Sequence, residues 1–327
     1  MNALSISRQR GLSLVELMIA ITLSLLLILG VTQIFLSSKQ TYSTNNALSR
    51  VQENGRFAIE FLTQDIRNTG YKGQCLGEPL NHLTNDQSGL LNLTSALKGW
   101  NNIATKPSHL NGTPLGGTDA ILVKLAAGVG DIAADTTNTA ASEAVGFSTN
   151  PGIPEGAITL ISDSISCDLF QNTAAATENA VSRDGGINTN ADWTHDYTAE
   201  TEALTVQNAT YYIRANAGRQ PSLVRERLAA GGTTWNTEEL VEGVQDMQIL
   251  YGIAGINMQV TDYVPAQSVT NWENVVSVQI NLLVTSAETN VLAENQVIAF
   301  NGADVTIDNR RLARIFSTTI GIRNRLP

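Results

Sequence analysis

The sequence predicts an α+β protein, in which one long N-terminal helix packs against an antiparallel β-sheet domain. An apolar run extends from Gly11 to Leu36 with a single charged residue, and apolar residues at helical spacing continue as far as Ile66. Strand-like segments are clearest later in the chain, after Thr201. A helix that comes first and strands that come later indicate α+β rather than alternating topology.

Residues 12–36 predict a helix that crosses a membrane or lies in the core of a fibre. At 1.5 Å per residue, the segment can span the roughly 30 Å of a bilayer's hydrocarbon core. Its one charge is Glu16, and the sequence has no Lys or Arg between Gly11 and Lys39 to pair with it. A carboxylate in lipid costs a few kcal/mol. Glu16 is therefore either a burden or a contact to another molecule.

Residues 37–69 predict the amphipathic half of the same helix. An apolar stripe recurs at spacings of three and four residues, namely Leu48, Val51, Gly55, Ile59, Leu62 and Ile66. Charged and polar residues occupy another face, namely Arg50, Glu53, Arg56, Glu60, Gln64 and Arg67. The spacing of Arg56 and Glu60 predicts an i,i+4 ion pair. Asn68-Thr69-Gly70 supplies a stop, so a helix from Leu12 to Asn68 would be roughly 85 Å long.

Residues 70–327 predict a β-rich domain. Between residues 71 and 200, short strand-like runs at Ala120–Leu125 and Ala157–Ile161 are separated by long Gly, Asn, Thr and Ser-rich loops. Later strand-like runs are Thr210–Ala215, Ser222–Leu228, Leu240–Leu250 and Val275–Thr285. The turn-forming residues 216–221 predict a hairpin between the first two of these.

The N-terminus predicts which side of the membrane the domain occupies. Arg8 and Arg10 precede the apolar run, and this positive charge favours a cytoplasmic N-terminus, with everything after Lys39 on the far side. A secretory signal would place its apolar stretch before the cleavage site. Here the apolar stretch follows the only plausible cut, so residues 1–11 are predicted to be a leader. An uncleaved signal anchor is the alternative.

Composition favours an exported structural surface over a cytosolic enzyme. Of 327 residues, 15% are charged and the formal net charge is −10. Loss of the leader leaves 18 basic against 30 acidic residues, a net charge of −12, which repels nucleic acid and anionic lipid. An oxidising compartment predicts a disulfide between Cys75 and Cys167. Two buried free thiols are the alternative.

The leader resembles a known signal. After Gly11 the chain reads Leu-Ser-Leu-Val-Glu-Leu-Met-Ile-Ala, which is similar to the type III signal of type IV prepilins and pseudopilins. The resemblance implies that a prepilin peptidase cuts between Gly11 and Leu12, that Leu12 becomes N-methylated, and that Glu16 is the family's fifth-position glutamate. Most family members have Phe at the first mature position, where this chain has Leu12, an apolar residue that the family tolerates.

Later segments resemble PilW-type minor pilins in particular. They are Arg50-Val-Gln-Glu-Asn-Gly-Arg-Phe-Ala-Ile-Glu60, Asp65-Ile-Arg67 with Gly70-Tyr71 and Cys75, Leu240-Val-Glu-Gly-Val-Gln-Asp-Met247 with Tyr251-Gly252, and Thr318-Thr-Ile-Gly-Ile-Arg-Asn-Arg325. This resemblance implies a non-catalytic subunit that primes a type IV pilus and lies near its tip, supporting twitching, adhesion or DNA uptake.

The resemblance also implies partners and a location. The partners are the prepilin peptidase, other minor pilins, the major pilin, the inner-membrane assembly platform and a tip adhesin. The chain would first span the inner membrane once, with a periplasmic domain, and would later be extracellular in the pilus. A minor pseudopilin of a type II secretion system is the nearest alternative, and a signal-anchored periplasmic enzyme a remote one.

Sequence motifs for chemistry are scarce. His82, His109 and His195 are the only histidines, and none lies in a zinc-binding His-Glu-x-x-His motif. No cofactor is predicted. Asp184, Asn188, Asn190 and Asp192 offer oxygen ligands for calcium, but their spacing is not that of an EF-hand, so a solvated polar loop is favoured.

The C-terminal segment is locally basic, with Arg310, Arg311, Arg314, Arg323 and Arg325. A DNA-binding patch is conceivable, since phosphate contacts need clustered bases. In so acidic a chain, pairing with its own carboxylates is favoured. Direct nucleic-acid binding is therefore not expected.

Overall fold

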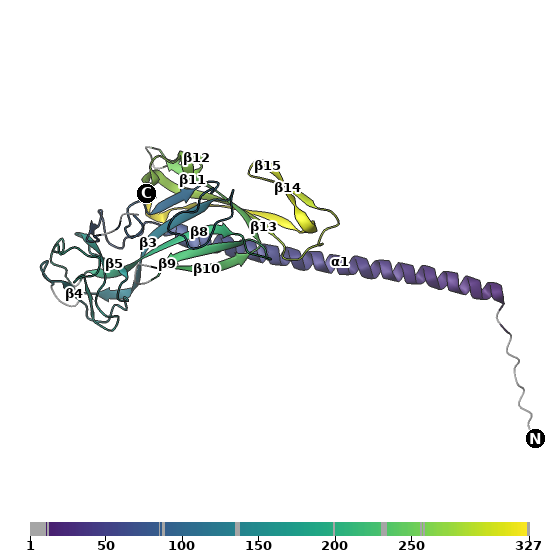
Figure 1. Ribbon diagram of the computed structural model, residues 1–327, viewed down its shortest axis with the longest axis horizontal. Helices are drawn as coiled ribbons and strands as arrows, with labels where there is room; N and C mark the ends of the chain where they lie inside the picture. The colour runs from purple at the N-terminus through teal and green to yellow at the C-terminus, as the bar shows by residue number, and fades with distance from the viewer. Residues whose placement is uncertain are drawn as a thin grey trace, which may run out of the picture.

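A computed structural model describes residues 11, 13–84, 86, 89–134, 138–198, 200–229, 234–255, 257 and 259–325. One long helix protrudes from a β-rich body, with its free end far from the body and its other half lying against the sheets (Figure 1). The predicted α+β fold class is confirmed. Leu12, Arg8 and Arg10 lie outside the described residues.

The helix α1 runs without interruption over Leu14–Arg67. Ser13 caps its first turn, and no proline or helix-breaking pair lies inside it. It ends at Asn68, and Gly70 follows with φ 77°, a left-handed conformation that glycine adopts without steric cost. The predicted single helix is confirmed over its described residues.

The larger sheet has eight strands among the described residues, in the order β1-β6-β5-β8-β3-β2, with β9 on β8 and β10 on β9. Their bounds are β1 Leu80–Asn81, β2 Leu97–Trp100, β3 Ala120–Ala133, β5 Ile158–Ser162, β6 Cys167–Gln171, β8 Glu202–Arg214, β9 Ser222–Leu228 and β10 Trp235–Glu242. All pairs are antiparallel except β1 with β6.

A second sheet has the order β12-β11-β13-β16 and is antiparallel throughout. Its bounds are β11 Val244–Ala254, β12 Val260–Val264, β13 Val275–Thr285 and β16 Ala313–Gly321. Two further antiparallel pairs complete the strands, β4 Ala144–Gly146 with β7 Ala180–Ser182, and β14 Gln296–Phe300 with β15 Ala303–Ile307. Single 3-10 turns are η1 Ala266–Ser268, η2 Trp272–Asn274, η3 Asp308–Arg310 and η4 Arg323–Arg325.

Several predicted strands match the structure closely, and one does not. Ser222–Leu228 and Val275–Thr285 are β9 and β13, and β8 and β9 form the predicted hairpin. The expected strand Leu240–Leu250 was wrong, because Gly243, at φ 93°, divides it between β10 and β11. A Cβ at Gly243 would meet the Thr285 carbonyl oxygen at 2.7 Å, so the chain needs glycine where it passes from one sheet to the other.

The main core lies where the second half of α1 meets both sheets. Its fully buried side chains include Leu62 and Ile66 of the helix, Tyr211 of β8 and Ile280 of β13. A separate cluster fills the lobe farthest from the helix N-terminus, around Phe170, Trp193 and Tyr197 (Figure 1). The first half of α1 belongs to neither core.

Candidate subunit-assembly site

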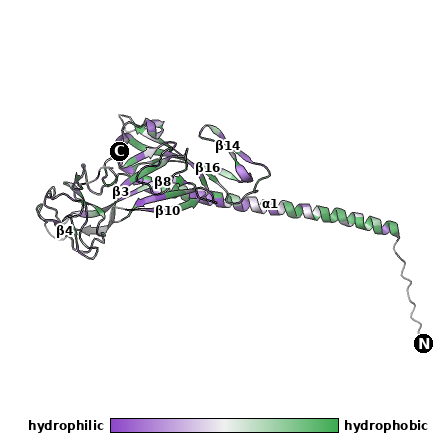
Figure 2. Ribbon diagram, viewed as in Figure 1, coloured by the Kyte–Doolittle hydropathy of each residue, from purple (hydrophilic) through white to green (hydrophobic). Residues whose placement is uncertain are grey.

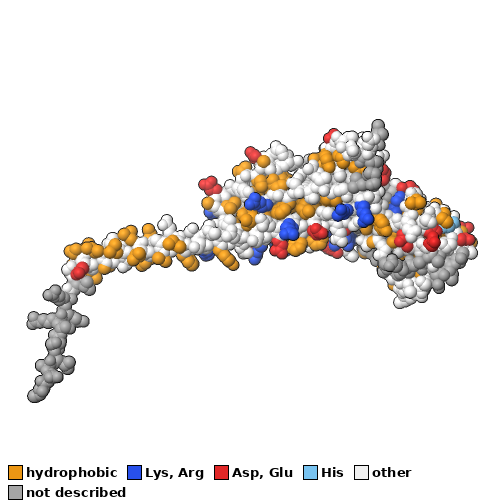
Figure 3. All heavy atoms as spheres, turned by 180° about the vertical axis from the view of Figure 1, so that it is seen from behind, with side chains coloured by type: hydrophobic (Ala, Val, Ile, Leu, Met, Phe, Trp, Pro, Cys, Tyr) orange, Lys and Arg blue, Asp and Glu red, His pale blue; other side chains and the backbone are white. Residues whose placement is uncertain are grey.

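The first half of α1 is apolar on every side and contacts none of the described domain. Large hydrophobic side chains from Leu14 to Leu36 keep between 52% and 74% of their surface exposed. Figure 2 shows hydrophobic colouring along this protruding half, and Figure 3 shows the same side chains in space-filling form. By length and composition the helix can cross a membrane. Such a surface needs lipid or other apolar helices around it.

Polar side chains in this half satisfy themselves within the helix. The hydroxyl groups of Thr22, Ser24 and Thr32 donate to the carbonyl oxygens four residues earlier, at 2.7–2.8 Å. A hydroxyl bonded in this way carries no unsatisfied donor into an apolar surrounding. These three residues therefore do not interrupt the apolar surface.

Glu16 lies in the first turn of α1, where it forms a capping box with Ser13. The Ser13 Oγ accepts from the Glu16 backbone N–H at 3.1 Å, and Glu16 Oε2 accepts from the Ser13 N–H at 3.3 Å. The positive end of the helix dipole also favours a carboxylate here. Glu16 is thus stabilised in the single chain by the helix itself, a contact that sequence reasoning missed although Ser-x-x-Glu before an apolar run signals it.

The domain begins to hold the helix near Gln40. The side chains of Gln40 and Thr44 both donate to the Val291 carbonyl oxygen, Thr44 at 3.1 Å. Arg50 then pairs with Glu288 at 2.8 Å, and Asn54 donates to the Glu242 carbonyl oxygen at 3.0 Å. These contacts precede and flank the first buried helix residue, Ala47.

The buried stripe differs in part from the predicted one. The structure buries Val51, Gly55, Leu62 and Ile66 as predicted, whereas Leu48 and Ile59 are half-buried. Ala47, Ala58 and Asp65 are buried in addition. A Cβ at Gly55 would meet the Phe316 ring of β16 at 2.2 Å, so glycine brings helix and strand into close approach.

Asp65 is a buried carboxylate that joins the helix to the larger sheet. It accepts from the Tyr211 hydroxyl at 2.6 Å and from Arg227 at 3.2 Å, while Arg225 lies 3.8 Å away. Burial, together with the charge of Asp65, raises the pKa of Tyr211 above its ordinary value. The position of Asp65, three residues after Leu62, was the available signal, since it falls on the apolar face.

The outer face of α1 borders the unpaired edge of β16. Two hollows follow one another along this seam, of about 630 Å³ and 620 Å³. The first is lined by Ser49, Gln52, Glu53, Arg56, Phe57, Glu60 and Phe316, and the second by Thr63, Arg67, Thr318, Thr319, Ile320, Gly321 and Arg323. β16 pairs with β13 on one side only. The seam thus combines an open strand edge with a charged helix face.

The predicted Arg56–Glu60 ion pair was wrong. Both side chains are exposed and line the first hollow, and the described residues contain no ion pair between them within 4 Å. Phe57 lies beside them and is 52% exposed. Solvent screening and rotamer entropy make an exposed pair worth little in isolation. The face therefore presents separate charges and one large apolar side chain.

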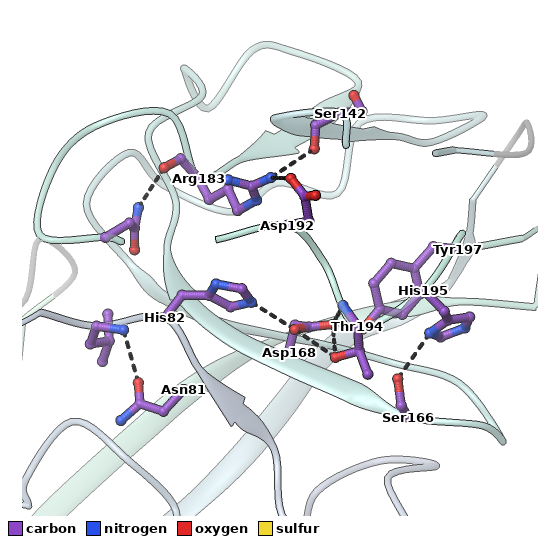
Figure 4. Close-up of polar contacts among 12 residues, drawn as sticks. Asn81, His82, Ser142, Ser166, Asp168, Arg183, Asp192, Thr194, His195 and Tyr197 are labelled. Carbon is purple, nitrogen blue, oxygen red and sulfur yellow. Dashed lines mark hydrogen bonds and ion pairs between the residues drawn. The ribbon is translucent and has the colours of Figure 1, made fainter. Parts of the chain in front are cut away.

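The two cysteines join separate segments of the distal region. Cys75 and Cys167 form a disulfide with their Cα atoms 5.6 Å apart, linking the segment after α1 to the start of β6. The next residue, Asp168, accepts from His82 Nε2 at 2.7 Å, from Thr194 Oγ1 at 2.8 Å and from the Tyr197 hydroxyl (Figure 4). Burial opposes ionisation of Asp168, but these donors hold its pKa below the ordinary value.

A second series in the same lobe has the residue types of a hydrolytic triad. Ser166 Oγ lies 2.9 Å from His195 Nδ1, as Figure 4 shows, and His195 Nε2 lies 2.8 Å from Asp163 Oδ2. Hydrolases also need free N–H groups for an oxyanion. Here the N–H groups of Ile165 and Ser166 both donate to Asp163 Oδ1, at 2.8 and 2.9 Å. These contacts favour a turn-stabilising role.

The candidate calcium loop is held by its own contacts. The Asn188 side chain accepts from the Gln171 N–H at 2.7 Å and donates to the Arg183 carbonyl oxygen at 3.0 Å. Asp192 lies 3.9 Å from Arg183. In the described part of the chain, no group of three or more His, Cys, Asp or Glu side chains could hold a metal ion. The contacts of Asn188 and Asp192 support the structural interpretation of this loop.

The C-terminal arginines bind the chain's own backbone more than its carboxylates. Arg311 donates to the carbonyl oxygens of Ser286 and Ala287, both at 2.8 Å, and Arg310 donates to the Asn290 side chain. Arg325 pairs with Glu273 at 3.1 Å and donates to the Val275 carbonyl oxygen at 3.0 Å. The expectation of carboxylate pairing is met by Arg325 alone among these three.

Family models match this chain near both of its ends. Residues 6–32 match the family model of the prokaryotic N-terminal methylation motif, and residues 210–324 match that of type IV pilus-assembly protein W. In these two regions, the chain is similar to type IV pilin proteins. The predicted resemblance to PilW-type minor pilins is confirmed.

Other comparisons add little. A search of curated proteins found no match. Among solved structures, a type IV-like pilin from Thermus thermophilus is similar, with 11% identity over 85% of this chain and 99% of that chain and a TM-score of 0.34. The matched family models point to a structural pilus component, with pilins as partners, and the N-terminal motif fits a membrane-anchored pilin.

Proposed function

We propose that this chain is a PilW-like minor pilin that primes a type IV pilus and is incorporated near its tip. One observation carries the proposal, namely a single helix whose first half is apolar all round and unburied while its second half is docked on a domain. A subunit built in this way has a stable domain, but the exposed half of its helix still needs other helices or lipid around it. Twitching motility, adhesion or DNA uptake would follow from assembly.

The proposed route begins in the inner membrane. Residues 12–36 hold the chain there as a single span with a cytoplasmic N-terminus, and the domain from residue 70 lies in the periplasm. The prepilin peptidase cuts after Gly11, and the new amine at Leu12 is methylated. The subunit then meets the assembly platform, other minor pilins, the major pilin and a tip adhesin, and becomes extracellular in the fibre.

Glu16 is the proposed contact between subunits. Its capping bonds use Oε2, so Oε1 can accept from the Leu12 amine of a neighbouring chain while the cap is retained. Pairing the two charges among apolar helices removes the penalty that each would have alone. Since a subunit at the extreme tip has no neighbour above it, Glu16 suggests a position just beneath the tip.

Glu16→Ala tests this contact. Losing one partner of a buried ion pair costs about 3–5 kcal/mol, so we expect normal membrane insertion but few surface pili by electron microscopy. Glu294→Ala, at an exposed carboxylate of the domain outside both hollows of the seam, serves as the control for insertion and expression. An unchanged number of pili with Glu16→Ala would contradict the contact.

Gly11→Val tests the leader separately. A branched side chain at the cleavage position should leave unprocessed precursor, measured as the intact mass of the purified chain. The same measurement on the native chain reports cleavage, methylation and the disulfide together. Normal mature mass in the variant would refute the leader assignment.

Loss of protein secretion without loss of pili in a deletion strain would favour the type II pseudopilin instead.

A further inference from the structure

Three of the chain's four tryptophans gather around one hollow outside the assembly seam. The hollow has a volume of about 570 Å³ and lies between the edge strand β2, its neighbour β3, the loop of residues 89–95 and the turn η2. Trp100 and Trp272 line it, and Trp235 lies just behind the lining residue His109. Small-molecule sites commonly have volumes of about 300–1,000 Å³ and aromatic walls.

The aromatic walls are held in fixed orientations. His109 lies between Trp100 and Trp235, with its ring tilted by 42° and 47° to theirs at ring-centroid distances of 5.6 and 5.0 Å, and its Nε2 lies 3.0 Å from Thr210 Oγ1. Burial lowers the pKa of His109 to about 4, so the ring is neutral at neutral pH. On the other side, Trp272 meets Tyr251 edge to face at 4.9 Å. A bound ring would therefore meet rigid, half-exposed indole surfaces.

A buried lysine fixes the loop that forms the third wall. Lys124 is 1% exposed, and its Nζ donates to the carbonyl oxygens of Gly89 and Thr94, both at 2.7 Å. It also reaches Asn92 Oδ1 at 3.5 Å. These bonds hold the loop in place, and Asn92, Thr94 and Ser95 of the loop line the hollow.

The rim is polar but close to neutral. It carries the amide of Asn92, the hydroxyl groups of Thr94, Ser95 and Ser108, and the exposed Lys98. The Lys98 Nζ lies 5.5 Å from the Trp100 ring centroid, above the indole face. Asp86 and Glu273 provide opposite charge near the buried Lys124. The surface thus offers aromatic faces together with neutral hydrogen-bonding groups.

We propose that this hollow, the tryptophan groove, binds a pyranose ring of a saccharide against the Trp100 face. The C–H groups on one side of a pyranose suit the electron-rich indole face, while its hydroxyl groups suit Ser108 and Lys98 at the rim. A wholly apolar ligand would leave these rim groups unpaired. Nucleic acid also stacks on aromatic rings, but it needs a basic channel, which the balanced charges and the net charge of −10 do not provide.

Saturation-transfer NMR on the purified full-length chain tests the proposal independently of pilus assembly. The chain is kept in a sugar-free zwitterionic detergent, because alkyl glycosides would compete. The probes are the methyl pyranosides of glucose, galactose, mannose and N-acetylglucosamine, with a ten-nucleotide oligo(dT) as the competing class. We expect saturable binding of at least one pyranoside, in the millimolar range.

Two variants test whether the ligand binds in the groove, and a third controls for the loss of a lysine charge outside it. Trp100→Ala should weaken binding at least about tenfold by removing the stacking face. Ser108→Trp should weaken it as much by filling the groove from an exposed position, and it decides the matter if Trp100→Ala fails to fold. Lys106→Ala, an exposed lysine outside the groove lining, should bind as the native chain does.

The opposite results are equally clear. Absence of saturable binding by all four pyranosides overturns the proposal, as does binding that Ser108→Trp leaves unchanged. Binding of oligo(dT) that Ser108→Trp abolishes, without pyranoside binding, would reassign the groove to single-stranded nucleic acid. None of these results bears on processing at Gly11 or pairing by Glu16, so failure of the groove and failure of the proposed pilin function are distinguishable.

Discussion

The two halves of α1 share one backbone but not one source of stability. In the first half, Leu26 is 62% exposed and touches no part of the described domain, whereas Leu62 in the second half is fully buried. Isolated helices are marginal in water unless an apolar face is covered. The domain covers the second half, and only lipid or neighbouring helices can cover the first. One helix is thus both a core element and an interface.

The largest expected effect would come from a matched pair of leucines. Leu62→Ala should reduce the free energy of unfolding by about 2–5 kcal/mol, because it opens a cavity in the main core. Leu26→Ala should change it by less than about 0.5 kcal/mol, as exposed positions generally do. Thermal unfolding of the detergent-solubilised chain, followed by near-UV circular dichroism, measures both. Equal losses would mean that the two halves are not energetically distinct.

A smaller effect is expected at the carboxylates of the docked half. Asp65→Ala leaves the Tyr211 hydroxyl and Arg227 without their acceptor, and should cost about 1–3 kcal/mol. Glu60→Ala removes an exposed carboxylate one turn earlier and should be within about 0.5 kcal/mol of the native chain. Urea unfolding midpoints compare the two. If Glu60→Ala destabilised the chain as much as Asp65→Ala, burial of the Asp65 carboxylate would not explain its contribution to stability.

The smallest effect on stability should come from Phe57, which sharpens the comparison within the docked half. Phe57→Ala should leave unfolding within about 0.5 kcal/mol of the native value, since the side chain is 52% exposed. If the seam with β16 contacts a neighbouring subunit, surface pili should nevertheless decrease. Leu76→Ala, at an 87% exposed site in the distal region, is the control. Normal piliation in the Phe57 variant would show that the seam is not part of the assembly surface.

Sequence reasoning recovered the elements best where local pattern and tertiary environment agree. β13 was predicted to the residue, because Ser277, Gln279 and Asn281 alternate with apolar residues in an otherwise apolar run. Leu240–Leu250 was predicted as one strand, because nothing local shows that Gly243 must pass beneath a carbonyl of another strand. In the distal lobe, the strand-like run Ala157–Ile161 was predicted close to β5, but the pairing of segments across long loops, such as β4 with β7, was not.

The residues of the candidate assembly site also divide into those that the sequence predicted and those that it did not. Glu16 was singled out from sequence because an acid inside an apolar run is costly wherever it lies, whereas Gly11 and Leu12 were implied by the resemblance to the prepilin signal. Phe316 and Phe57 could not be found in this manner, since they meet only after β16 folds back beside a helix more than 250 residues earlier. Asp65 was predictable only in part. Its position on the apolar stripe could be read from the sequence, but its partners on β8 and β9 could not.

By itself, the sequence determined that an apolar helix leads the chain, that one acid lies within it, and that an antiparallel β domain follows. Those features depend on neighbours a few residues apart, which a linear pattern records. Only the tertiary structure decided which residues of the apolar stripe are fully buried, that Arg56 and Glu60 stay apart, and that three tryptophans gather around one groove. Those outcomes depend on contacts between residues distant in the chain, whose energies are set by packing rather than by local order.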